Sequence, residues 1–290
     1  MRLFVGLAER AWVERVAALG PADASLWRPH RRRFRALDPG EPYLLKLHAP
    51  EHAVVGAGRF VAAERLPLAL AWLAFGAANG AADPDEFRRH VARAAHEPVS
   101  PDRPISCVLL DHPAILPRAD WLPVPADWRP SVAHGKVYRG AQARALWQEV
   151  QARLGERWRP ATDDGPGPGR FRLAVAEAYG QRCAVTGERT LAALDVVHLR
   201  PPSRGGPNEV GNGLLLRADL ARLFEHGLLI VEPDGYVVRV HERVRRLGAG
   251  TTAYAQLDGR PLRVLPERFD LLPGPEYLAE RASGWAATGR

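Results

Sequence analysis

Cysteine is scarce in this sequence, which excludes two common structural devices. The chain has only Cys107 and Cys183, which lie far apart, and neither belongs to a Cys-x-x-Cys pair. Structural zinc sites draw on closely spaced Cys and His residues, so a zinc knuckle is excluded. The lack of a disulfide framework indicates a reducing compartment, and we expect a cytoplasmic protein.

Long apolar runs are missing as well. No stretch approaches the roughly 20 apolar residues that a membrane-spanning helix needs. Residues 1–6 read Met-Arg-Leu-Phe-Val-Gly and contain neither the apolar core nor the cleavage site of a signal peptide. We therefore expect no membrane segment and no secretion.

Lysine is nearly absent, although the chain is basic. Only Lys46 and Lys136 occur, so arginine supplies nearly all of the positive charge behind the formal net charge of +7. Guanidinium groups bind phosphate in a bidentate manner, which fits a polyanionic partner such as nucleic acid. A GC-rich genome would produce the same arginine bias, so the charge alone does not decide between these explanations.

Glycine and proline, in contrast, are concentrated where a domain boundary is expected. Residues 155–169 end in Asp-Gly-Pro-Gly-Pro-Gly, which holds neither helix nor strand. This predicted linker separates residues 1–154 from residues 170–290. A chain of 290 residues has room for two domains. Short apolar strands and amphipathic helices occur in both parts, and we predict an α+β fold.

The most informative stretch is residues 183–230. An apolar strand delivers His198 at its end, and a Gly/Pro loop follows. Asn212 then opens a segment whose apolar residues fall at helical spacing: Leu215, Leu216, Leu220, Leu223 and Phe224. The pattern predicts a strand, a loop and a helix, with His198 and Asn212 at the two joints.

This stretch resembles the ββα-metal finger of HNH endonucleases in the spacing of His198, Asn212 and position 221, and in the flanking Gly-Leu-Leu-Leu and Leu-Phe. The resemblance implies that His198 takes a proton from water, and that Asn212 orients the imidazole by accepting a hydrogen bond from it. It also implies a divalent cation of the Mg²⁺ or Mn²⁺ class, which stabilises the charge that develops during phosphodiester hydrolysis.

The metal site is where the sequence departs from that family. The family has a metal-binding His at the position of Ala221, and alanine has no donor atom. Asp195 and Glu225 are candidate ligands, although Asp195 falls on the opposite face of an ideal strand from His198, and Glu225 also suits a solvated helix charge. Val197 stands where many HNH proteins have an acidic residue or His. We expect an inactive form, and deliberate replacement of a histidine fits the intact neighbourhood of Ala221 better than drift.

Two groups of arginines are candidates for contacts with phosphates: Arg200, Arg204 and Arg217 beside the predicted site, and Arg31, Arg32 and Arg33 in the first half of the chain. The alternative for each of them is a solvated side chain without a function in binding.

Residues 1–154 resemble a second family. Trp27-Arg-Pro, Gly40-Glu-Pro-Tyr-Leu-Leu-Lys-Leu-His, Val55-Gly-Ala-Gly-Arg-Phe and Gly135-Lys-Val-Tyr are similar to segments of PUA-like domains of the EVE and ASCH kind. The resemblance implies a β-barrel with flanking helices that binds a modified nucleobase in an aromatic pocket. For that pocket we select four rings, for each of which core packing is the alternative: Trp27, Phe34, Tyr43 and Phe60.

The two resemblances together predict a modification-dependent endonuclease that acts on double-stranded DNA. A catalytically dead reader of nucleic acid and an RNA-directed nuclease are the alternatives. Because HNH fingers typically cut one strand each, we also expect a homodimer. The residues do not indicate which modification is read, which metal ion is used, or how far from the modified base the strand is cut.

Overall fold

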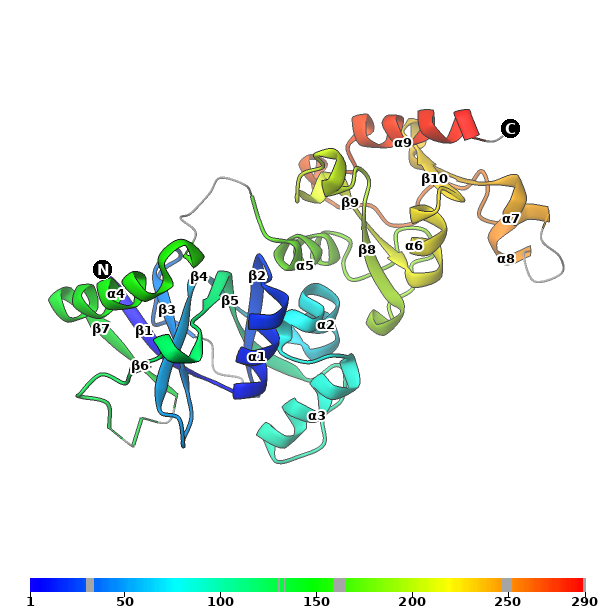
Figure 1. Ribbon diagram of the computed structural model, residues 1–290. Coiled ribbons are helices and arrows are strands. Elements are labelled where there is room, and N and C mark those ends of the chain that lie inside the picture. The colour runs from blue at the N-terminus through cyan, green and yellow to red at the C-terminus, as the bar shows by residue number, and fades with distance from the viewer. Residues whose placement is uncertain (30–33, 130, 133, 159–164, 247–251, 289–290) are drawn as a thin grey trace. The chain divides into compact units, whose positions relative to one another are not determined.

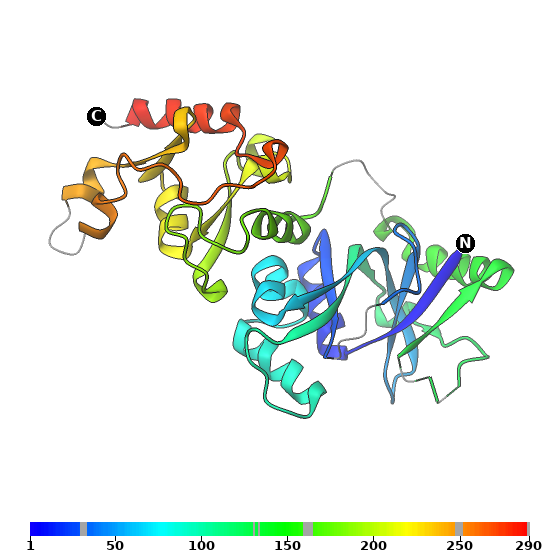
Figure 2. The same cartoon turned by 180° about the vertical axis from the view of Figure 1, so that it is seen from behind.

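Two compact units, Met1–Gly169 and Arg170–Arg290, make up the chain. The structure is a computed structural model that describes all residues except 30–33, 130, 133, 159–164, 247–251 and 289–290. Both units contain helices and strands, which confirms the predicted α+β class (Figures 1 and 2). Within the described ranges no helix combines the length and apolar character needed to cross a bilayer.

One mixed sheet of seven strands forms the centre of the N-terminal unit. The strand order is β2-β5-β4-β3-β1-β7, and β6 pairs with β4. β1 and β3 run parallel, whereas the other described pairs are antiparallel. The strands are β1 (Arg2–Ala8), β2 (Asp23–Arg28), β3 (Pro42–Leu47), β4 (Ala53–Pro67), β5 (Pro104–Ile115), β6 (Leu122–Pro123) and β7 (Gly135–Arg139).

The glycines of this sheet allow close approaches that a side chain would block. A Cβ at Gly56 in β4 would lie 2.4 Å from the carbonyl oxygen of Ala114 in β5. A Cβ at Gly6 in β1 would lie 1.9 Å from the hydroxyl oxygen of Tyr43, which is fully buried under β1. The sheet therefore packs tightly because these two positions lack side chains.

Four helices flank the sheet: α1 (Arg10–Leu19), α2 (Leu68–Phe75), α3 (Pro84–Ala95) and α4 (Gly140–Leu154). Ala143, Val150 and Leu154 of α4 belong to the same buried core as Leu3 of β1. Beyond α4, the ring of Trp158 packs against Trp147, with 4.7 Å between centroids. The N-terminal unit thus continues past residue 154, where we predicted the linker to begin.

Both lysines of the chain lie in this unit. Lys46 in β3 is 1% exposed, and its Nζ donates to the carbonyl oxygen of Leu47 at 2.6 Å and lies 5.2 Å from the ring centroid of Trp128. Burial lowers the pKa of this ammonium. Lys136 in β7 pairs with Asp127 at 2.6 Å.

The C-terminal unit contains two hairpins among short helices. β8 pairs with β9 and β10 pairs with β11, each antiparallel. The elements are α5 (Pro168–Ala178), β8 (Leu194–His198), β9 (Gly213–Arg217), α6 (Ala218–Glu225), β10 (Leu229–Glu232), β11 (Val237–Val240), α7 (Glu242–Arg246), α8 (Thr252–Ala255) and α9 (Pro275–Thr288).

The helix that we predicted to begin at Asn212 begins six residues later, and this is a correction. Residues 213–217 form β9, and α6 starts at Ala218. The run Gly213-Leu-Leu-Leu is apolar throughout, so its periodicity does not distinguish a buried strand from a helix. Pairing with β8 decides in favour of the strand, and the segment has the order strand, strand, helix.

Candidate functional site

The hairpin β8–β9 places His198 at its open end. In the register Leu194 faces Arg217 and His198 faces Gly213, so His198 is the last paired residue before the loop 199–212. Helix α6 follows β9 directly and packs against both strands of the hairpin. The predicted catalytic histidine is therefore presented by the end of a strand, as the sequence indicated.

Helix α5 covers the face of the hairpin that carries His198. The imidazole stacks on the ring of Phe171, with centroids 4.1 Å apart and planes at 17°. A Cβ at Gly213 would lie 2.5 Å from Val175 Cγ2, so glycine is needed for this close approach of α5. Burial lowers the pKa of His198 below its ordinary value of 6.5, and the charge of Arg172 acts in the same direction. A neutral imidazole is able to accept a proton.

The residue that forms a hydrogen bond with this imidazole is Asn208. Asn208 Oδ1 lies 3.0 Å from His198 Nε2. Because an amide oxygen only accepts, Nε2 carries the hydrogen and Nδ1 keeps its lone pair. This hydrogen bond raises the pKa of His198 and offsets part of the effect of burial. We predicted that Asn212 accepts this hydrogen bond, and the structure corrects the residue to Asn208. The predicted type of contact, an amide oxygen that accepts from the imidazole, is unchanged.

Asn212 instead fastens the loop that carries Asn208. The Asn212 side chain is fully buried, and its Oδ1 accepts from the backbone N–H of Arg200 at 2.8 Å. Its Nδ2 donates to the carbonyl oxygens of Arg200 at 2.9 Å and Pro207 at 2.8 Å. A Cβ at Gly206 would lie 1.9 Å from the same Arg200 oxygen. The loop thus has little freedom once Asn212 is in place.

The candidate metal ligands do not come together. Ala221 is 1% exposed and Val197 is 3% exposed, and neither has a donor atom. Asp195 is exposed and accepts from the backbone N–H of Val196 at 2.8 Å, and Glu225 is exposed at the end of α6. Over the part of the chain that the structure describes, no three His, Cys, Asp or Glu side chains converge. These residues do not fit a divalent cation of the Mg²⁺ or Mn²⁺ class.

Two of the three arginines predicted to contact phosphates near this site have carboxylate partners. Arg200 pairs with Glu280 at 2.6 Å, and Arg217 pairs with Asp219 at 2.7 Å. The pair with Arg217 lowers the pKa of Asp219 to about 2. Arg204 is exposed and has no ion pair with a described residue. Of these three arginines, Arg204 is the one whose charge no described carboxylate neutralises.

The four rings selected for a base pocket do not gather in one place. Phe34 packs with Phe4, Tyr43 and Phe60 at centroid distances of 4.8, 5.8 and 5.2 Å. Tyr43 and Phe60 are buried, so these two rings are core residues of the N-terminal unit, which corrects their assignment to the pocket. Trp27 lies apart from them among the described ring contacts. The predicted arginines Arg31, Arg32 and Arg33 lie outside the described residues.

Trp27 lines a separate cavity of about 240 Å³. Its indole Nε1 donates to the carbonyl oxygen of Asn79 at 2.9 Å, and Trp12 and His90 form further parts of the wall. The Asn79 side chain is fully buried, and its Oδ1 has no hydrogen-bond partner among the described residues. Of the four predicted rings, Trp27 therefore borders a cavity that described residues form.

Phe171 and Asn208 are the contacts of His198 that the sequence did not single out. Asn208 ends the run Ser203-Arg-Gly-Gly-Pro-Asn, and an amide in a loop between His198 and Asn212 is a detectable signal. Phe171 has no comparable signal, because an aromatic ring on an amphipathic helix usually fills a core.

Comparison with known proteins supports one of the two resemblances directly. The HNH endonuclease family model matches residues 183–232, a segment that contains His198, Asn208 and Asn212. No curated protein matches the chain. The N-terminal half is similar to the crystal structure of ASCH from Zymomonas mobilis, with 13% identity, a TM-score of 0.36, and coverage of 50% of this chain and 94% of that chain. Two point mutants of that protein have 13% and 14% identity, TM-scores of 0.36, and coverage of 50% of this chain and of 96% and 94% of theirs.

Proposed function

Because residues 183–232 match the HNH endonuclease family, we propose that the chain is a modification-dependent DNA endonuclease. The C-terminal unit carries the hydrolytic site, and the N-terminal unit reads a modified base. The observation on which the proposal depends is the position of His198, which stacks on Phe171 and bonds to Asn208 within the matched segment.

In this proposal His198 is the general base. Its lowered pKa keeps the ring neutral at physiological pH, and Asn208 fixes the hydrogen on Nε2. Nδ1 then accepts a proton from a water molecule, whose oxygen attacks the phosphorus of a phosphodiester. The bond from phosphorus to one sugar oxygen breaks, and that oxygen leaves as an alkoxide that takes a proton from solvent water. A neutral base held in one tautomer by a neighbouring amide is what this step requires.

We also propose that this form does not cut. The buried positions 197 and 221 hold Val197 and Ala221, where the family supplies donor atoms. A single apolar position would fit the deliberate replacement of one histidine. Apolar residues at both positions also fit the alternative function, in which the C-terminal unit binds nucleic acid without hydrolysing it.

For the N-terminal unit we propose that the modified base enters the cavity beside Trp27. Reading a base within a duplex requires its removal from the stack, and an aromatic face then replaces its neighbours. The cavity of about 240 Å³ provides the half-buried ring of Trp27 as such a face.

The test is to supply the missing donors and measure strand cleavage. We expect the variant Val197→Asp/Ala221→His to nick a duplex with one modified cytosine or adenine in Mg²⁺ or Mn²⁺, and to lose this activity in EDTA. Adding His198→Ala should abolish nicking, and Trp27→Ala should reduce the preference for the modified duplex. Circular dichroism checks that each variant is folded.

The other outcomes decide between the alternatives. A folded Val197→Asp/Ala221→His protein that binds the modified duplex but never nicks it supports the catalytically dead reader. Preference for structured RNA over every duplex supports an RNA-directed nuclease. We propose a homodimer for double-strand cleavage, and cleavage of both strands by a dilute monomer would contradict it.

A further inference from the structure

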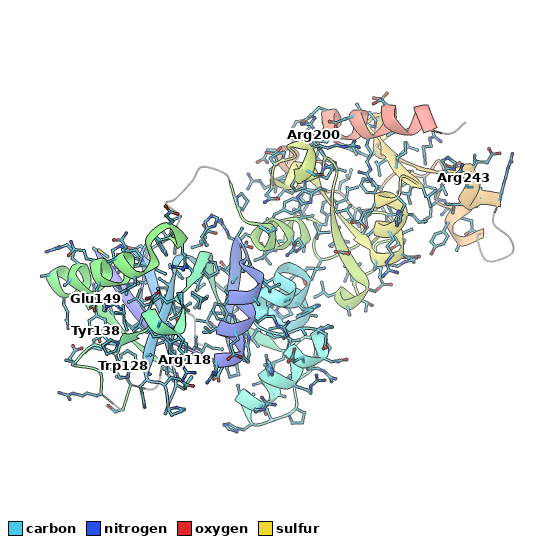
Figure 3. All side chains as sticks on the ribbon, in the orientation of Figure 1. Arg118, Trp128, Tyr138, Glu149, Arg200 and Arg243 are labelled. Atoms are coloured by element: carbon cyan, nitrogen blue, oxygen red, sulfur yellow. The ribbon has the colours of Figure 1, made fainter. Side chains whose placement is uncertain are left out.

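A polar cavity of about 590 Å³ lies beside the C-terminal end of α6, and none of the functions above uses it. Its walls come from the loop after β8, the end of α6, the segment after β11, and α9. Arg204, Arg243 and Arg281 lie on these walls, and Figure 3 labels Arg243 at α7. We refer to this cavity as the arginine pocket.

Arg281 is the fixed cation of the arginine pocket. Its Nη1 donates to the carbonyl oxygen of Leu199 at 3.3 Å, its Nη2 donates to that of Phe224, and its guanidinium lies 3.8 Å from the centroid of the Phe224 ring. Burial lowers the pKa of Arg281, Glu225 raises it, and the charge of Arg204 lowers it further. Two guanidinium groups therefore repel each other here, and an anion between them would relieve the repulsion.

The carboxylates of the arginine pocket do not balance its cations. Glu280 already pairs with Arg200 at 2.6 Å, and Arg200 is not part of the lining. Glu225 is the remaining carboxylate and acts on Arg281. Arg204 and Arg243 are exposed and form no ion pair with a described residue. The pocket therefore keeps an excess of positive charge, in spite of the negative end of α6.

We propose that the arginine pocket binds a phosphate group of a polynucleotide backbone, and that it does so without a metal ion. Guanidinium groups match phosphate oxygens in a bidentate manner, and the exposed Arg204 and Arg243 are able to do so. Arg281, whose Nη groups donate to backbone carbonyl oxygens, adds its positive charge to the pocket. His198 does not line the pocket, although Leu199 does. The bound phosphate is therefore an anchor, distinct from the phosphate that His198 faces. The inference rests on the proposed binding of nucleic acid.

The experiment compares two double variants of the full chain in EDTA. Arg204→Gln/Arg243→Gln removes two charges from the pocket, whereas Arg189→Gln/Arg222→Gln removes two exposed charges that do not line it. Affinity for a short duplex is measured by fluorescence anisotropy at several salt concentrations. We expect the pocket variant to bind about tenfold more weakly and to reduce the salt slope by about 0.9, which is the contribution of the single phosphate contact that is lost. The control variant should stay within about twofold of the wild type.

Equal binding by the two double variants would overturn the proposal. Inorganic phosphate and a nucleoside monophosphate serve as competitors of the duplex. If either of them displaces the duplex while the pocket variant leaves the duplex affinity unchanged, the pocket binds free phosphate, and the proposal of a polynucleotide ligand is overturned. A wild-type chain that binds neither duplex nor RNA removes the proposed function as well. Duplex binding that survives the pocket variant removes this inference alone.

Discussion

The pKa of His198 is set by neighbours with opposite effects. Burial against Phe171 lowers it, and the hydrogen bond to Asn208 raises it. Because the native pKa lies below the ordinary 6.5, the unfolded chain binds more protons between the two values. The contribution of His198 to stability is therefore present above pH 6.5 and is lost as the pH falls through the native pKa.

Substitution of each neighbour should move this pKa in a predictable direction. We expect Asn208→Ala to lower the pKa of His198 further and Phe171→Ala to raise it toward 6.5. NMR titration of the imidazole measures both, with a His198→Gln protein to assign the signal. Asn212→Ala is the comparison, because it loosens the loop without removing a direct contact. An Asn208→Ala protein with an unchanged His198 pKa would contradict the assigned contact.

The sequence identifies His198 but does not identify its amide partner. The strand before His198 is apolar and short, so its end is readable from the pattern. Asn208 and Asn212 are the same chemical type in the same loop, and only the loop conformation decides which one reaches the ring. The sequence does not predict the residues that line the pockets either. Arg281, for example, contacts Leu199, which lies far from it along the chain.

At the scale of elements, the loop 199–212 is held in place by packing as well as by hydrogen bonds. Asn212 ties the loop to Arg200 and Pro207, and Gly206 lies against the Arg200 carbonyl. The prediction of a helix from Asn212 is wrong because residues 213–217 pair with β8. This pairing, and not the local helix propensity of the segment, determines their structure.

Gly206→Ala should therefore weaken the C-terminal unit. A Cβ at Gly206 would lie 1.9 Å from a backbone oxygen, which has no rotamer with which to move away. We expect a loss of about 1–3 kcal/mol in the free energy of unfolding, measured by urea denaturation. Gly211→Ala is the matched control, since its Cβ would lie 3.3 Å from the Leu272 oxygen and should cost less. Equal losses would show that the contact with Arg200 is not the cause.

At the scale of the whole molecule, the chain divides into two compact units, and residues 155–169, for which we predicted a linker, belong to the first of them. The Gly/Pro run indicates a boundary, because it cannot hold regular structure. Trp158 nevertheless packs against Trp147 of the first unit. A single aromatic residue after a helix does not predict such a contact from the sequence. The division at residues 169 and 170 reflects the distribution of contacts, which composition does not record.

Separate cores should unfold separately. Gly6→Ala, whose Cβ would lie 1.9 Å from Tyr43 Oη, should lower the melting temperature of the N-terminal unit. Gly213→Ala, whose Cβ would lie 2.5 Å from Val175 Cγ2, should lower that of the C-terminal unit. Differential scanning calorimetry should show each substitution moving its own transition by a few degrees, since units larger than 100 residues shift by roughly 2–4 °C per kcal/mol. A single transition that both substitutions shift equally would contradict independent cores.

The scarcity of lysine has a practical consequence. Lys46 of β3 is buried, and its ammonium lies over the ring of Trp128. Lys136 reaches the surface, where it pairs with Asp127. Among the side chains, an amine-reactive dye should therefore couple at Lys136 and leave every guanidinium untouched. Enzymes that acetylate or ubiquitinate lysine would find the same lone target, so the positive charge of the arginines lies beyond the reach of such modification.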